Sequence, residues 1–119
     1  MYRLVLVAVV ACAACTQSDN DRPATLEYIT AAILQPSCGQ YVCHSSFVRA
    51  KGYAFDTLEA ARVSLAPIVN TTDDGTSSFL YKVLTRKVKR MPYDAPLPLK
   101  DIDLIVKWID DGAPGLEAP

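Results

Sequence analysis

Residues 38 to 44 hold the side chains on which the interpretation of the whole chain depends, and they read Cys38-Gly39-Gln40-Tyr41-Val42-Cys43-His44. The only histidine of the chain directly follows the second of the two cysteines that lie outside the N-terminal segment. Thiols and imidazoles are reactive groups and metal ligands. Their grouping in one short segment therefore predicts a cofactor site, a metal site or a disulfide.

A cysteine followed directly by histidine ends the c-type haem attachment signature. In that chemistry two thiols bond to the vinyl groups of haem, and the neighbouring imidazole lies on one face of the iron. Four residues separate Cys38 from Cys43, whereas the usual signature has two. Four-residue spacers occur among multihaem cytochromes, so the departure from the usual spacing weakens the haem interpretation but does not exclude it.

Two other interpretations of these residues stay open. An exported domain with two cysteines normally oxidises them, so Cys38 and Cys43 could form a disulfide without haem. The closed loop would be short, so its entropic contribution would lie at or below the low end of the usual ~2–4 kcal/mol. A zinc site is the third interpretation, but two thiols and His44 lack an evident fourth ligand at typical spacing.

Met91 is the candidate for a second iron ligand, because it is the only methionine after the initiator. It precedes a segment with three prolines between Pro92 and Pro98, which predicts a rigid extended loop. A thioether opposite an imidazole favours reduced iron and raises the reduction potential, which suits electron transfer. The alternative role of Met91 is to fill a gap in the core.

Outward from these residues, the spacing of apolar side chains predicts one all-α domain with long loops. We expect helices over about residues 25–35, from 57 to about 65, after Ser77 or Ser78, and from about 98 to 111. Pro36 and Pro67 should end the first two helices, and Thr57 and Gly112 should cap the second and the last. The third and last helices should bury Phe79, Leu80, Val83, Leu84, Ile102, Ile105, Val106 and Ile109, with Trp108 beside them.

The order of these motifs resembles small bacterial c-type cytochrome domains, most closely the planctomycete-type and related lipoprotein domains. The resemblance covers roughly residues 26 to 114. It is carried by the Cys-x-x-x-x-Cys-His segment, Ser77-Ser78-Phe79-Leu80, Arg90-Met91-Pro92, Leu97 and Ile105-Val106-Lys107-Trp108-Ile109-Asp110-Asp111-Gly112-Ala113. The Cys-His and Met-Pro pairs are fairly specific in combination, whereas the last helix is specific to the group but not to its chemistry.

The resemblance implies a class I cytochrome c fold, in which the first and last helices cross near their ends. It also implies one haem c, held covalently by Cys38 and Cys43, with His44 and Met91 as axial ligands. Such a protein would be a monomer that carries electrons between redox partner proteins, and not an enzyme that acts on a small-molecule substrate. The alternative, from another class, is a haem-free exported lipoprotein that binds a partner and has a Cys38–Cys43 disulfide.

The N-terminus is typical of a bacterial lipoprotein signal. Residues 4 to 11 are apolar and follow Arg3, but they are too few for a membrane span of about 20 residues. Cys12 and Cys15 each follow small residues as in a lipobox, so either could carry a lipid; the alternative is an ordinary cleaved signal with incidental cysteines. We therefore expect a signal at 1–15, cut before Cys12 or Cys15, a tether at 16–24, the domain at 25–114 and a tail at 115–119. The protein would be anchored to a bacterial membrane, on the periplasmic or cell-surface side.

Charge and composition exclude several functional classes. Twelve basic and 13 acidic residues leave a net charge of -1, with no electrostatic footprint for nucleic acid. Paired carboxylates, a Ser-His-Asp set and a glycine-rich phosphate loop are all missing from the sequence, so hydrolase and nucleotide-binding functions find no support. One basic run predicts either a docking patch for an acidic redox partner or a solvated helix face: Lys82, Arg86, Lys87, Lys89 and Arg90.

Overall fold

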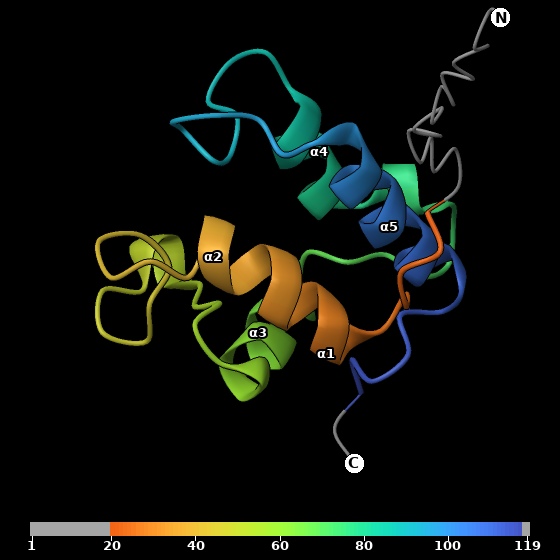
Figure 1. The fold of residues 1–119 in the computed structure, drawn as a ribbon, viewed down its shortest axis with the longest axis horizontal. Helices are drawn as coiled ribbons and strands as arrows, with labels where there is room; N and C mark the ends of the chain where they lie inside the picture. Colours follow the sequence, from red (N-terminus) through yellow and green to blue (C-terminus); the bar gives the residue numbers. More distant parts are fainter. Residues whose placement is uncertain (1–19, 118–119) are drawn as a thin grey trace, which may run out of the picture.

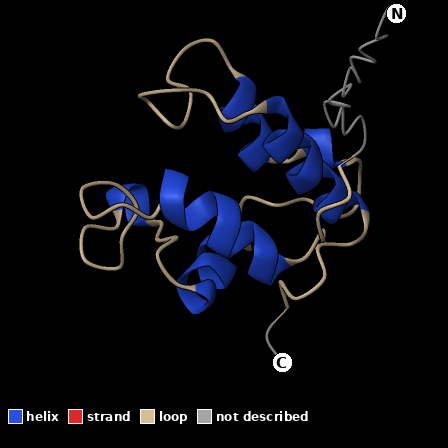
Figure 2. Cartoon of the chain, viewed as in Figure 1, coloured by secondary structure: helices blue, strands red, loops and turns tan. Residues whose placement is uncertain are grey.

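The computed structural model describes residues 20–117, and every regular element in that range is a helix (Figures 1 and 2). The elements are α1 (Leu26–Ile29), the π-helix η1 (Thr30–Leu34), α2 (Gln35–Ser37), the 3₁₀ helix η2 (Ala50–Gly52), α3 (Leu58–Leu65), the 3₁₀ helix η3 (Gly75–Ser77), α4 (Phe79–Thr85) and α5 (Leu99–Asp110). Since α1, η1 and α2 follow one another without a break, they form one long helical segment. The predicted all-α fold class is confirmed for the described residues.

The first helical segment starts as expected but ends later than predicted. Thr25 caps it, because its hydroxyl accepts a hydrogen bond from the N–H of Tyr28 at 3.2 Å. The prediction that Pro36 ends the helix was wrong, since the helix continues to Ser37. A proline ring normally clashes with the carbonyl four residues earlier. Pro36 lies in the first turn of α2, after the wider π turn of η1, and proline is tolerated in the first turn of a helix.

The N-termini of α3 and α4 are held in different ways. Thr57 caps α3 as predicted, with its hydroxyl accepting from the N–H of Ala60 at 3.1 Å. Ser78 occupies the corresponding position of α4, but its side chain makes no cap hydrogen bond. The buried Ser78 hydroxyl accepts instead from the N–H of Asn70 at 2.8 Å. This serine therefore fastens the loop before α4 rather than the helix itself.

Helix α5 ends in a Schellman motif at the predicted glycine. Gly112 has φ +93°, its N–H donates to the carbonyl of Ile109, and the N–H of Ala113 donates to the carbonyl of Trp108, both at 2.9 Å. Three of the four aliphatic residues predicted to be buried in α5 are in the core, whereas Val106 is only half-buried. The buried residues of this helix are Ile102, Leu104, Ile105, Trp108 and Ile109.

The core lies where the first helical segment meets α3 and α5. Helix α1 contacts both of these helices, and α5 also contacts α4 (Figure 1). The first and last helices are thus in contact. The largest apolar side chains that are almost completely buried come from these elements: Leu26, Ile29, Ile33, Leu34, Leu65, Leu104, Ile105, Trp108 and Ile109.

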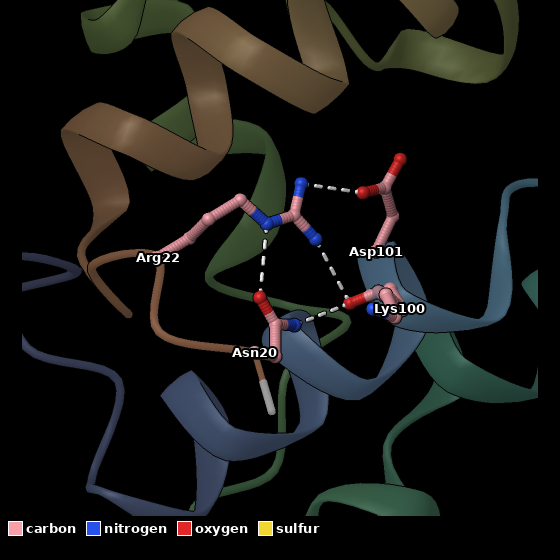
Figure 3. Close-up of polar contacts among 4 residues, drawn as sticks. All are labelled: Asn20, Arg22, Lys100 and Asp101. Carbon is pink, nitrogen blue, oxygen red and sulfur yellow. Dashed lines mark hydrogen bonds and ion pairs between the residues drawn. The ribbon is translucent and has the colours of Figure 1, made fainter. Parts of the chain in front are cut away.

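The segment before α1 is attached to the start of α5 (Figure 3). Arg22 forms an ion pair with Asp101 at 2.7 Å and also donates to the carbonyl of Lys100 at 3.0 Å. The Asn20 amide accepts from Arg22 and donates to the same carbonyl. Asp101 lies in the first turn of α5, where a negative charge is favourable. The predicted tether of residues 16–24 therefore contacts the domain from Asn20 onward.

Candidate functional site

A cavity of about 360 Å³ brings together three of the residues that the sequence analysis selected. Cys38, His44 and Met91 all line it, although Met91 comes from a distant part of the chain. Most of the other lining residues are aliphatic or aromatic, and three are cationic: Leu34, Lys51, Tyr53, Phe55, Ile68, Phe79, Leu80, Val83, Leu84, Arg86, Lys89 and Tyr93. Figure 1 shows that the loops after α2 and after α4 extend toward the same side of the molecule. Such a mostly apolar cavity with a few polar groups is typical of a ligand site.

The four-residue spacer between the two cysteines folds into a closed turn. The N–H of Cys43 donates to the carbonyl of Gln40 at 2.9 Å, and the N–H of His44 donates to the carbonyl of Cys38 at 3.1 Å. Gly39 allows this loop to approach the chain at residues 55–56, because a Cβ there would lie 2.8 Å from the carbonyl oxygen of Phe55. The loop is therefore held in place by its own backbone and by close packing.

The imidazole of His44 is oriented by neighbours from residues 53 to 55. Its Nδ1 lies 3.3 Å from the carbonyl oxygen of Tyr53. A carbonyl can only accept, so in the neutral ring this contact favours the tautomer with the proton on Nδ1 and the lone pair on Nε2. The ring also packs edge-on against Phe55, with centroids 5.4 Å apart. This arrangement prepares Nε2 to coordinate a metal.

The two cysteines occupy different environments, and both thiols are free in the structure. Cys38 is half-buried and lines the cavity, whereas Cys43 is exposed and does not. Burial, together with the smaller effects of the nearby Cys43 and Asp94, raises the pKa of the Cys38 thiol to about 11. Cys38 is thus a protonated thiol at neutral pH.

Met91 is placed beside α4 by its backbone. Its N–H donates to the carbonyl of Val83 at 2.9 Å, and its half-buried side chain faces the cavity. The prediction that Phe79 and Val83 point into the core was wrong. Phe79 is 50% exposed, Val83 is half-buried, and both line the cavity. Leu80 and Leu84 are buried as predicted, and both also line the cavity, so α4 belongs to the core and to the cavity wall.

The predicted basic patch divides into parts with different surroundings. Arg86 and Lys89 are exposed and line the cavity, whereas Lys82 and Lys87 are exposed but do not. Arg90 is half-buried, and its Nε has no hydrogen-bond partner among the described residues. The five residues therefore do not form one uniform solvated surface.

Several residues of the site were not found from the sequence, and four of them are informative. Tyr53 and Phe55 alternate along an extended stretch, and their rings stack 6.4 Å apart beside His44. This i, i+2 spacing of aromatic residues was the available signal. Lys51 gave no signal, because its place at the cavity depends on the fold of the whole loop. Asp56 holds the loop by accepting from the backbone N–H and the hydroxyl of Ser46 at 2.8 and 2.7 Å, and these hydrogen bonds lower its pKa.

The predicted lipid-anchor residues Cys12 and Cys15 lie outside the described residues. Over residues 20–117, no helix has the length and apolar character needed to cross a membrane. No group of three or more His, Cys, Asp or Glu side chains suited to a metal ion was found in that range either.

Comparisons with models of protein families, with curated proteins and with solved structures found no match.

Proposed function

We propose that this chain is a monohaem c-type cytochrome, exported as a lipoprotein, that passes single electrons between redox partner proteins. One observation carries the proposal: Cys38, His44 and Met91 line a single apolar cavity. Packing alone requires neither a thiol nor an imidazole at such a place. A thiol there would supply covalent attachment, and an imidazole and a thioether would supply ligands for the iron.

The lining of the cavity fits haem in its chemistry. The aliphatic and aromatic side chains suit an apolar macrocycle, and the free Nε2 of His44 and the sulfur of Met91 are both iron ligands. Bound haem supplies an iron that takes up and releases one electron. The chain would orient the imidazole through the Tyr53 carbonyl, hold the thioether through the backbone contact of Met91 with α4, and keep water away with apolar side chains. These surroundings favour the reduced state.

The two cysteines would contribute unequally to covalent attachment. Cys38 already lies at the cavity, whereas Cys43 would have to turn inward from an exposed position. We therefore expect Cys38→Ser to reduce covalent haem incorporation more than Cys43→Ser does. Intact mass spectrometry of the two matured variants measures this difference. Equal incorporation would mean that the exposed position of Cys43 has no bearing on attachment.

Expression with a cytochrome c maturation system tests the haem proposal. A haem stain on a denaturing gel should colour the wild-type band, and the double variant Cys38→Ser/Cys43→Ser should give a colourless one. The proposal fails if the wild-type band is colourless and mass spectrometry finds a Cys38–Cys43 disulfide. That result would favour the alternative of a haem-free binding lipoprotein, which the proximity of the two thiols would allow.

The membrane anchor is a separate part of the proposal. A lipid on Cys12 or Cys15 would hold the domain on the periplasmic or cell-surface side of a bacterial membrane. Labelling with a radioactive fatty acid should be lost in either Cys12→Ser or Cys15→Ser. Retention of the label in both single variants would contradict a single lipidated cysteine.

Docking of an acidic redox partner would use the exposed lysines that do not face the cavity, Lys82 and Lys87. Electron transfer to such a partner should slow at high ionic strength, because exposed charges are screened by salt. A rate that does not change with salt would leave these lysines as a solvated helix face.

A further inference from the structure

Three cations belong to the cavity that the proposed haem would occupy. Lys51 comes from the loop after His44, whereas Arg86 and Lys89 follow α4, so the cations reach the cavity from two separate loops. Among the described residues, no acidic side chain lines this cavity, and neither Lys51 nor Lys89 forms an ion pair within residues 20–117. Arg86 Nε donates to the carbonyl of Lys89 at 2.9 Å, which holds these two residues together. The cavity thus combines an apolar lining with positive charge that has no acidic counterpart there.

The backbone supplies a second, independent observation. Lys51 has φ +55° and Lys89 has φ +54°, so both lie in the left-handed region. Glycine adopts this region without strain, whereas a residue with a Cβ does so at a cost. On each of the two loops, therefore, one lysine has a backbone conformation that only glycine adopts without strain. Among the described residues, Arg49 and Ala113 also have positive φ but do not line the cavity, so the lysines are the two such positions that do. Backbone strain of this kind is found at ligand sites.

The region near Cys38 has the opposite charge. Asp94 lies close enough to Cys38 to raise the pKa of its thiol. A ligand with carboxylates would be repelled by Asp94 and attracted by the three cations. The charge distribution therefore favours one orientation of an acidic ligand, with its carboxylates away from Asp94.

We propose that Lys51, Arg86 and Lys89 form a carboxylate-binding rim, which selects a ligand with an apolar body and at least two carboxylates and determines its orientation. The inference rests on the proposed function and deepens it, because haem has an apolar macrocycle and two propionate carboxylates. A ligand bound to this rim would also link the loop after His44 to the loop before Met91. The rim would thereby help to keep both axial side chains at the cavity.

A binding experiment on the full chain without haem tests the rim directly. Protoporphyrin IX and its dimethyl ester share the same macrocycle, but only the first carries carboxylates. Fluorescence titration should show that the wild type prefers the diacid. Each exposed charge pair is worth up to about fivefold in affinity, so the preference should fall about tenfold in Lys51→Gln/Lys89→Gln at low salt.

The matched control is Lys82→Gln/Lys87→Gln, which removes the same charge from exposed positions outside the cavity. In this control the preference for the diacid should stay within about twofold of the wild-type value, because exposed charges outside the cavity contribute little. Equal preferences in the two double variants would overturn the rim.

A glycine variant, Lys51→Gly/Lys89→Gly, removes the same two charges without adding backbone strain, because glycine adopts a positive φ freely. This variant should stay folded by circular dichroism and should also lose the preference; retention of the preference would contradict the inference.

The haem-loaded protein provides a second readout. Cations beside the propionates should keep the carboxyls ionised, so Lys51→Gln/Lys89→Gln should lower the midpoint potential and move its pH-dependent step to higher pH. Identical shifts in the control variant would contradict the rim. The two proposals fail separately: a colourless gel band overturns the haem proposal, whereas a haem-stained protein with unchanged potential and unchanged diacid preference overturns only the rim.

Discussion

Trp108 in α5 and Phe79 in α4 are both large aromatic residues, yet they lie in opposite kinds of surroundings. Trp108 is 0% exposed within the core cluster, and its indole N–H donates to the carbonyl of Pro114 at 3.0 Å. Phe79 is 50% exposed and faces the cavity. The same contrast separates two whole regions: a core of α1, α3 and α5, and a cavity region formed by the loops around His44 and Met91.

The contrast indicates which region is stable by itself. In the core, apolar side chains of different helices bury one another, and each buried large side chain contributes about 1.5–3 kcal/mol. In the cavity region, apolar side chains line a space that a ligand would fill. A ligand that binds only the native state stabilises it in proportion to the logarithm of its concentration over Kd. We therefore expect the core to set the stability of the haem-free chain, and the cavity region to depend on the ligand.

Among the substitutions that test this contrast, Trp108→Ala should change the free energy of unfolding most. Removal of a fully buried indole should destabilise the domain by about 3–5 kcal/mol, with or without haem. Denaturant unfolding followed by circular dichroism measures the change. Leu99→Ala is the control on the same helix, since Leu99 is 77% exposed and its loss should cost within about 0.5 kcal/mol. Similar losses in the two variants would contradict the role given to the core.

Two neighbouring residues of α4 both line the cavity but differ in how deeply they are buried. Leu80 is 5% exposed and belongs to the core cluster, so Leu80→Ala should cost about 2–5 kcal/mol in the haem-free chain. Phe79→Ala should cost only about 1 kcal/mol there, because half of its side chain is exposed. In the haem-loaded protein the cost of Phe79→Ala should rise, since the ring would then contact the macrocycle. A cost that stays the same on loading would mean that the cavity and the haem site are not the same place.

The core could largely be predicted from the sequence, because its signals are local. The helical spacing of apolar residues predicted α3 and α5. Thr57 marked the start of α3 and Gly112 the end of α5, because capping depends only on residues close in sequence. Pro36 is the exception. It lies in the first turn of α2, after a π turn, and no residue type predicts such a turn in advance.

The cavity region could be predicted only in part, because its geometry depends on contacts between distant segments. Cys38, His44 and Met91 were found from their rare chemistry, which needs no three-dimensional information. The direction of Phe79 was missed, since an apolar side chain facing a cavity has the same helical spacing as one facing the core. Lys51 was missed because its position follows from how the whole loop folds.

The two cysteines allow a smaller test within the cavity region. At pH 8 on the order of one Cys38 thiol in a thousand is ionised, because its pKa is raised to about 11. Iodoacetamide should therefore modify the exposed Cys43 of the reduced, haem-free chain first, and Cys38 should react faster as the pH approaches 11. Peptide mass spectrometry after timed quenching measures both rates. Equal rates at pH 8 would contradict the buried position of Cys38.

The smallest predicted effect concerns Asp56, which fastens the loop after His44. Hydrogen bonds from Ser46 lower the pKa of Asp56, so this contribution is complete above the ordinary pKa of about 3.9 and is lost as the pH falls through the lowered value. The Ser46 amide resonance should show an acid transition with a midpoint below pH 3.9. Asp56→Asn should abolish it. A midpoint at or above the ordinary value would mean that the loop is not held in this way.

We propose above that the cavity holds a haem with His44 and Met91 as iron ligands, and absorption spectroscopy of the matured protein tests this most directly. The oxidised wild type should show the thioether-to-iron charge-transfer absorbance. Met91→Ala should keep its covalent haem but lose this absorbance, and its midpoint potential should fall because the thioether favours reduced iron. A haem-stained Met91→Ala protein with the spectrum and potential of the wild type would contradict the claim and leave Met91 as a packing residue.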